Sequence, residues 1–165
     1  MSLFFNSSIH PKIRSIDESL RKQSIELLNQ FFKQINSYPL DGIFKVKPKA
    51  ATPMVDSFLK LSGSGKVLFI GVVLDSELTS MLIARIEERP FLLEEKILYV
   101  DIAVTKNGHL KKGYMKSLIG YAEEWAQKKD IQILELRTLT ANQDAIRFWN
   151  KQNYKEFYIR FRKTI

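Results

Sequence analysis

The sequence predicts an α/β (α+β) fold, in which a mixed, largely antiparallel central sheet is flanked by helices in αβα layers. Three observations predict it: apolar runs of strand length, stretches with apolar residues at helical spacing, and one strand–helix–strand crossover around Gly113. Parallel neighbours need such a crossover, whereas runs joined by short polar turns form antiparallel hairpins. The 165 residues can bury one sizeable core, so we expect a single domain over 1–165.

The N-terminal half is expected to contribute two helices. The stretch 15–35 begins with Ser15 and Glu18 at the spacing of a capping box, and apolar residues then recur every three or four positions. A shorter helix follows, with Thr52 as its N-cap and Pro53 at its first helical position.

Three strands are predicted next. The run 66–74 is almost continuously apolar and rich in β-branched residues, which indicates a central strand, and 78–88 follows as its hairpin partner. The third strand spans 96–104. Regular alternation along it predicts one face with Ile97, Tyr99, Asp101 and Ala103, and an opposite face with Leu98, Val100, Ile102 and Val104.

The C-terminal part adds a helix, a strand, a helix and a strand. The long helix that starts near Gly113 carries one clear apolar stripe, and a strand is expected over 131–139. The next helix has Asn142 as its N-cap and Asn153 as a left-handed stop. The final run, 154–165, alternates as a strand does. Its buried face is expected to hold Phe157, Ile159 and Phe161.

Composition excludes several classes of site. The absence of cysteine excludes disulfides, thiolate zinc sites and a cysteine nucleophile, and His10 and His109 alone do not make a histidine metal cluster or a Ser–His hydrolase. We therefore expect no metal. No apolar run approaches the roughly 20 residues of a membrane helix, and 1–15 lacks the basic and long apolar regions of a signal peptide. A cytoplasmic protein without a membrane partner is the expectation.

The turn between Val104 and Gly113 concentrates positive charge at the start of a helix. Lys106, Lys111 and Lys112 lie around two glycines, where a helix N-terminus exposes unpaired N–H groups. Glycine allows a ligand to approach the backbone closely, so the turn has the properties of a phosphate or pyrophosphate cradle. A solvated loop is the alternative. The net charge of +8 also leaves nucleic-acid binding open, although the lysines gather at one turn rather than along a helix.

The sequence from about Val67 to Phe157 resembles the GNAT superfamily of N-acetyltransferases. The segment "LKKGYM" falls on the family's pyrophosphate loop, with Gly113 at its first glycine. The strand ending "DIAV" resembles the family's "DLAV", and "NQDAIRFWNKQNYKEF" resembles its "N-x-x-A-x-x-F-Y-x-x-x-G-F". The sequence departs from this pattern at Leu110, Met115 and Trp149. Trp149 stands where the family often has a catalytic tyrosine.

The resemblance implies acetyl-CoA as cosubstrate and direct transfer of its acetyl group to a primary amine. Lys106, with other lysines, would offset the negative charge of the pyrophosphate. The residues implied in cofactor binding are Ile102, Ala103, Val104, His109, Leu110, Lys111, Lys112, Gly113, Tyr114, Met115, Lys116, Asn142, Ala145, Phe148 and Trp149.

The reaction needs a base, because an alkyl ammonium, with a pKa near ~10.4, is a poor nucleophile. Asp101 is our candidate base, and Glu135 and Glu156 are alternatives. Tyr158 and Trp149 are candidates for assisting the leaving thiolate. The acceptor is expected to be a small-molecule or peptide amine, and a homodimer stays open. A CoA-binding sensor or interaction module without efficient catalysis is the alternative function.

Overall fold

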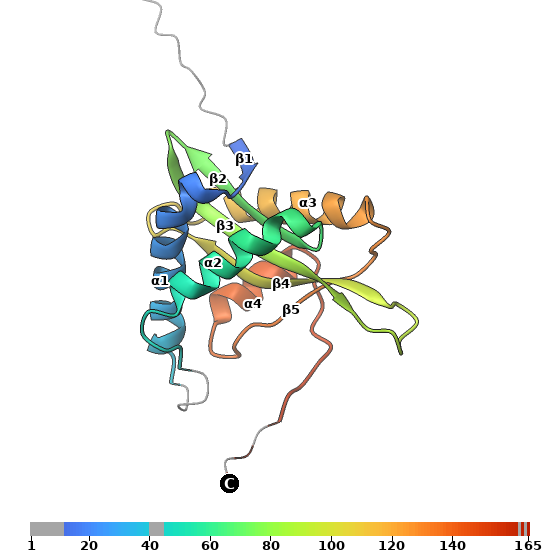
Figure 1. The fold of residues 1–165 in the computed structure, drawn as a ribbon. Helices are drawn as coiled ribbons and strands as arrows, with labels where there is room; N and C mark the ends of the chain where they lie inside the picture. The colour runs from blue at the N-terminus through green and yellow to red at the C-terminus, as the bar shows by residue number, and fades with distance from the viewer. Residues whose placement is uncertain (1–11, 40–44, 162, 164) are drawn as a thin grey trace, which may run out of the picture.

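The computed structural model describes residues 12–39, 45–161, 163 and 165. Five strands form one sheet in the order β1-β2-β3-β4-β5 (Figure 1). The strands are β1 (Lys12–Ser15), β2 (Val67–Leu74), β3 (Glu77–Glu88), β4 (Lys96–Thr105) and β5 (Leu134–Leu136). Neighbours from β1 to β4 are antiparallel, and β5 runs parallel to β4. The predicted mixed, largely antiparallel sheet is therefore confirmed.

Helices cover both faces of this sheet. On one face, α1 (Arg21–Ser37) and α2 (Ala51–Leu61) pack on a core cluster that includes Met81 and Ile83 of β3. On the other face, α3 (Tyr114–Gln127) and α4 (Gln143–Lys151) pack on a second cluster that includes Leu82 and Ala84. The β3–β4 hairpin extends beyond α1 and α2, which leaves its part of the first face without a helix over it (Figure 1).

Several local predictions are confirmed. Asp75 and Ser76, which join β2 to β3, both have positive φ, as a tight two-residue hairpin turn requires. Asn142 caps α4, because its side chain accepts a hydrogen bond from the N–H of Ala145 (3.2 Å). Asn153 has a φ of 64° and ends that helix in the left-handed region.

Two predicted helix starts are wrong. Ser15 does not cap α1, because it is the last residue of β1 and pairs with Ile70 of β2. A short 3-10 helix, Glu18–Leu20, precedes α1 instead, and Asp17 caps it. Thr52 lies inside α2, which starts at Ala51 without a side-chain cap. Ser15 cannot serve as a helix cap because its backbone is paired in β1, at the edge of the sheet.

The prediction of a C-terminal strand is also wrong. Of the predicted 154–165, residues 154–161 form no strand, and 162 and 164 lie outside the described residues; β5 is limited to three residues of the predicted 131–139. Phe157, Ile159 and Phe161, expected on a buried face, are exposed. Alternation alone does not make a strand, because the backbone also needs a neighbouring strand to pair with. None of the described strands pairs with this segment.

The predicted faces of β4 are wrong at its middle. Ile102 of β4 pairs with Ile83 of β3, whereas Val100 pairs with Ala84, so Asp101 is an extra residue on β4. Such a β-bulge reverses the alternation of the strand. Leu98 and Val100 therefore pack towards α3, whereas Ile102 and Val104 pack towards α1 and α2.

Candidate functional site

The segment 106–113, here called the basic turn, joins β4 to α3. Gly108, Lys111 and Gly113 all have φ in the left-handed region, and Gly113 is the N-cap residue of α3 with a φ of 83°. No side chain of the described residues caps this helix end. The first backbone bond of the helix runs from the N–H of Ser117 to Gly113 O (3.0 Å). The N–H groups of the first helical turn are thus available to an external acceptor.

The space next to these N–H groups is open. A Cβ built on Gly108 or Gly113 would meet no atom within 4 Å. The side chains of Lys111, Lys112 and Lys116 are exposed around the same helix end. An uncapped helix N-terminus, open space and three exposed ammonium groups fit a pyrophosphate, which needs hydrogen-bond donors and positive charge together.

Lys106 does not point its charge into this space. Its ammonium group contacts Glu77 of β3, and His109 Nε2 lies 3.3 Å from the other carboxylate oxygen of Glu77. The hydrogen bond from Lys106 lowers the pKa of the Glu77 carboxyl. His109 Nδ1 is buried and has no hydrogen-bond partner in the described structure. Glu77 therefore fastens the first part of the basic turn to the sheet.

Gln30 of α1 fastens the same part of the turn from the other side. Its side-chain amide donates to Thr105 O (3.0 Å) and accepts from the N–H of Asn107 (2.9 Å). These two backbone bonds fix where the chain leaves β4. Sequence reasoning missed both Gln30 and Glu77, because nothing local indicates a partner 75 or 29 residues away.

The other predicted cofactor residues divide into core and surface positions. Tyr114, Met115 and Ala103 are partly buried against the core cluster under α3, and Ile102 and Val104 are buried in the cluster under α1 and α2. Met115 therefore fills the core rather than the space at the turn. Leu110 is exposed. Residues 102–104 can serve a ligand through their backbone, because their side chains pack inside the protein.

The α4 residues lie on the core face shared with α3. Ala145 and Phe148 are partly buried there, and Trp149 is 9% exposed. The Trp149 ring contacts those of Phe148 and Tyr154 edge-on, with centroids 5.1 Å apart in both pairs. Trp149 therefore holds α4 and the segment after it against the core. Burial raises the pKa of Tyr154, whose hydroxyl lacks a hydrogen-bond partner in the described structure.

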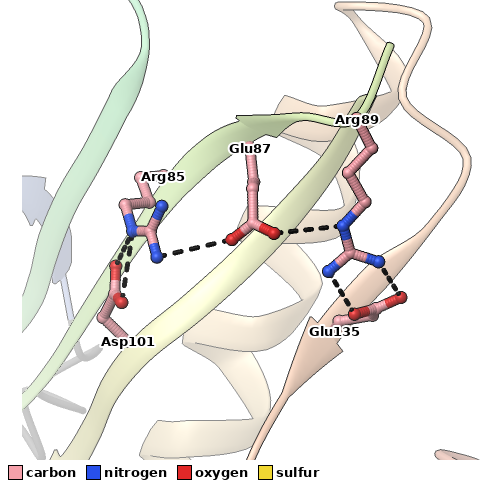
Figure 2. A network of polar contacts seen from close by, with 5 residues as sticks. All are labelled: Arg85, Glu87, Arg89, Asp101 and Glu135. Carbon is pink, nitrogen blue, oxygen red and sulfur yellow. Dashed lines mark hydrogen bonds and ion pairs between the residues drawn. The ribbon is translucent and has the colours of Figure 1, made fainter. Parts of the chain in front are cut away.

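Asp101 begins a row of alternating charges, here called the charged strip (Figure 2). Arg85 Nε donates to both carboxylate oxygens of Asp101 (3.0 and 3.3 Å), and Arg85 Nη2 lies 3.4 Å from Glu87. Glu87 also accepts from Arg89 Nε (3.0 Å). Arg89 then makes two bonds to Glu135 of β5 (2.9 and 2.7 Å). The strip thus connects β4, β3 and β5 on the part of the first sheet face that α1 and α2 do not cover.

The two ends of the strip differ. The pair between Arg89 and Glu135 is bidentate, and its side chains are only 26% and 15% exposed. At the other end, Arg85 is 43% exposed and reaches Asp101 through Nε alone. Burial raises the pKa of the Asp101 carboxyl, although Arg85 opposes this effect. Arg89 is therefore a structural clamp, whereas Asp101 is a carboxylate that binds protons more readily than an ordinary aspartate.

Part of β4 has no described strand on the side of β5. Pairing between β4 and β5 covers Leu98 to Val100 and ends there, whereas β4 continues to Thr105 with β3 as its only neighbour among the described strands. The outer backbone edge of residues 101–105 is thus open between Asp101 and the basic turn. Two other predicted residues lie elsewhere, since Glu156 is exposed and Tyr158 is 75% exposed in the segment after α4. Sequence reasoning missed Arg85 and Arg89.

Comparison with known proteins decides the family. The sequence matches the acetyltransferase (GNAT) family over residues 32–154, which include the sheet from β2 to β5, the basic turn and α4. The chain belongs to the GNAT acetyltransferase family. No curated protein matches the sequence closely enough to be called a relative. The matched residues of this GNAT protein include both the basic turn and the charged strip.

Solved structures share the GNAT fold at low sequence identity. The tetramutant of the BH1408 protein from Bacillus halodurans has a TM-score of 0.81 at 14% identity, with 93% of this chain and 99% of that chain covered. The PaiA N-acetyltransferase from Thermoplasma acidophilum, in complex with coenzyme A, gives 0.73 at 19% identity and covers 87% and 88%. The aminoglycoside N-acetyltransferase AAC(6')-Iy, in complex with CoA, gives 0.72 at 14% identity and covers 94% and 96%.

Two further observations concern other kinds of site. Among the described helices, none is long and apolar enough to span a membrane. Over residues 12–39, 45–161, 163 and 165, no cluster of three or more acidic or histidine side chains could hold a metal ion.

Proposed function

We propose that this protein transfers the acetyl group of acetyl-CoA to a primary amine. The observation that carries the proposal is the uncapped N-terminus of α3, which the basic turn joins to the end of β4 that has no pairing with β5. The family membership and the CoA complexes of two structural neighbours support the same cofactor. Lys111, Lys112 and Lys116 would offset the charge of the pyrophosphate.

The residues of the chain supply orientation, charge stabilisation and a proton acceptor. Acetyl-CoA brings a thioester whose carbonyl carbon the amine attacks, so that a C–N bond forms and the C–S bond breaks. Backbone N–H groups near Ala103 and Val104 would stabilise the negative charge that develops on the carbonyl oxygen. Asp101 accepts the proton that the amine nitrogen loses, directly or through one water molecule.

The raised pKa of Asp101 suits this role. A carboxylate with a low pKa would be a weaker base, and general-base efficiency improves as the pKa approaches the working pH. The sulfur leaves as a thiolate, because a thiol has an intrinsic pKa of about 8.5. Trp149 cannot protonate it, since an indole N–H is a hydrogen-bond donor only.

The proposal is tested by binding and then by turnover. Acetyl-CoA at about 100 times its Kd should stabilise the fold by roughly 2.7 kcal/mol, which is several degrees in Tm at about 2–4 °C per kcal/mol. A panel of polyamines, aminoglycosides, amino acids and peptides should then show CoA release with at least one acceptor. No Tm shift at millimolar acetyl-CoA would exclude the cofactor.

The alternative function is a CoA-binding module without efficient catalysis. The burial of Trp149 at the family's tyrosine position favours it, because no hydroxyl group is supplied there. A Tm shift with acetyl-CoA but no CoA release with any amine of the panel would support this alternative.

A further inference from the structure

Arg85 is hydrogen-bonded to Asp101, the carboxylate that the proposed reaction needs as its base. Its guanidinium bridges two acids, with Nε on Asp101 (3.0 Å) and Nη2 near Glu87 (3.4 Å), and its Cζ lies 5.3 Å from the centre of the Tyr99 ring. Arg85 Nε takes one acceptor position on each oxygen of Asp101, and its positive charge repels an ammonium group that approaches the remaining positions. The acceptor therefore has to compete with a group of the protein itself.

The contacts of Arg85 are of the kind that a ligand can replace. The Arg85 side chain is 43% exposed and the Asp101 side chain 19%, so the pair is partly exposed, and Arg85 holds Asp101 through Nε alone rather than through two parallel bonds. Arg89, by contrast, holds Glu135 in two parallel bonds and is mostly buried. Displacing Arg85 therefore leaves the link between β3 and β5 intact.

The charge balance of the charged strip favours a cation as the replacement. The strip holds three carboxylates and two guanidinium groups, and the charge of Arg137, which lowers the pKa of Asp101, balances the third carboxylate; displacement of Arg85 therefore leaves a negative charge in excess. If Arg85 swings out, Asp101 loses the arginine that is bonded to it and Oε2 of Glu87 is freed, whereas Oε1 of Glu87 keeps its bond from Arg89 (3.0 Å). A molecule with two ammonium groups can pair with both, whereas a monoamine can pair with one.

We propose that Arg85 is a specificity-determining residue that holds the place of the acceptor, and that an acceptor with two ammonium groups displaces it from Asp101 and Glu87. This inference rests on the proposed acetyl transfer. Arg85 acts through Asp101 and Glu87, and it selects dications because only they replace both of its contacts.

The first test compares acceptor kinetics in three variants. With 1,4-diaminobutane and butylamine as probes, Arg85→Gln should lower KM for the diamine about three- to fivefold, because the competing cation is gone. KM for the monoamine should fall less, and the affinity for acetyl-CoA should not change. The KM of Arg85→Lys for the diamine should lie between those of wild type and Arg85→Gln, since a lysine cannot bridge two carboxylates in the planar way that a guanidinium does.

Arg14→Gln is the matched control. Arg14 also forms an arginine–aspartate pair, with Asp17 (2.8 Å), but it lies on β1 at the opposite edge of the sheet. This variant should leave both KM values unchanged. An unchanged or higher KM for the diamine in Arg85→Gln would overturn the proposal, and so would equal decreases for both probes.

A second measurement needs no turnover. Calorimetry on the CoA-loaded protein should give a tighter diamine Kd for Arg85→Gln than for wild type. The NMR signal of Arg85 Nε–H should shift when the diamine binds to wild type, because its bond to Asp101 breaks. If wild type transfers no acetyl group but both binding results are obtained, the proposed function fails and this inference stands. If transfer occurs while the Arg85 signal does not respond, only this inference fails.

Discussion

The basic turn presents backbone groups to a ligand, whereas the charged strip consists of side chains that are already paired. The turn offers backbone N–H groups at the start of α3 and surrounds them with exposed lysines, whereas the strip consists of side chains from β3, β4 and β5 that pair with one another. The turn has donors without partners, and the strip has partners for every charge. A ligand of the turn therefore fills open space, but a ligand of the strip has to displace something.

The pKa values of Glu77 and Asp101 are shifted in opposite directions at these two places. Glu77, which fastens the basic turn, has a lowered pKa because Lys106 donates to it. Asp101, at the end of the strip, has a raised pKa because burial outweighs the help of Arg85. Lys106 therefore favours the ionised form of Glu77, whereas burial favours the protonated form of Asp101. A variant at one position should leave the other unaffected.

Asp101→Asn should show the largest effect. Loss of a general base typically costs about 10²- to 10⁴-fold in rate, so kcat should fall by that amount on the best acceptor, while the Kd of acetyl-CoA stays the same because the basic turn is intact. Asp17→Asn is the control, since Asp17 is a carboxylate paired with an arginine at the opposite sheet edge. A kcat within threefold of wild type would show that Asp101 is not the base.

The basic turn is tested by an isosteric pair at Gly113. Asn tolerates the left-handed backbone of this residue and Asp has nearly the same shape, so the two variants differ in charge alone. An Asp carboxylate would itself accept from the N–H groups of α3 and repel pyrophosphate. Gly113→Asp should therefore bind CoA about tenfold more weakly than Gly113→Asn, a difference of about 1.4 kcal/mol.

Lys128→Asp is the control for diffuse electrostatics. It changes the charge by two rather than one, but Lys128 lies at the C-terminal end of α3. CoA affinity should fall less in this variant than in Gly113→Asp. Equal losses in the two variants would mean that CoA is attracted by the overall positive charge rather than bound at the turn.

The difference between turn and strip also decides what the sequence could predict. The turn is local: Gly113, the lysines and the following amphipathic helix are contiguous, so their pattern predicts a helix N-terminus with an anion site. The strip depends on the register between three strands. Arg85 lies opposite Tyr99 and reaches Asp101 two residues further along β4, so the contact depends on this register, and nothing in the alternating sequence of β4 reveals that Asp101 is an extra residue.

The same reasoning explains the wrong strand at the C-terminus. Phe157, Ile159 and Phe161 alternate as well as the residues of β4 do, but pairing depends on a free and adjacent sheet edge, which a periodicity does not report. The caps behave in the opposite way. Asn142 was predicted correctly because its partner, Ala145, lies only three residues ahead.

The pH dependence of stability should have opposite signs at the two carboxylates. The pKa of Glu77 is lowered in the folded protein, so its stabilisation is present at neutral pH and is lost as pH falls through that pKa. The pKa of Asp101 is raised, so its contribution is present at low pH and is lost as pH rises through that pKa.

Thermal unfolding of Glu77→Gln and Asp101→Asn from about pH 3 to about pH 7 tests this, because the lowered pKa of Glu77 places its loss of stabilisation below its ordinary range. Relative to wild type, Tm should become lower with rising pH for Glu77→Gln and higher for Asp101→Asn, by a few degrees at most for one titrating group (roughly 2–4 °C per kcal/mol). Parallel trends in the two variants would contradict the contrast drawn between these carboxylates.

The smallest effects on kcat are expected at Trp149 and Tyr158. Trp149 is packed between Phe148 and Tyr154, so Trp149→Phe removes packing but no proton donor, and kcat should stay within about threefold of wild type because a general acid, worth about 10²- to 10⁴-fold, is not lost. Tyr158 is exposed after α4, and Tyr158→Phe should change kcat as little. A collapse of kcat in Trp149→Phe, at unchanged acetyl-CoA affinity, would show that the indole takes part in thiolate departure. A collapse in Tyr158→Phe would instead show that the exposed segment closes over the site and brings the phenol to the sulfur.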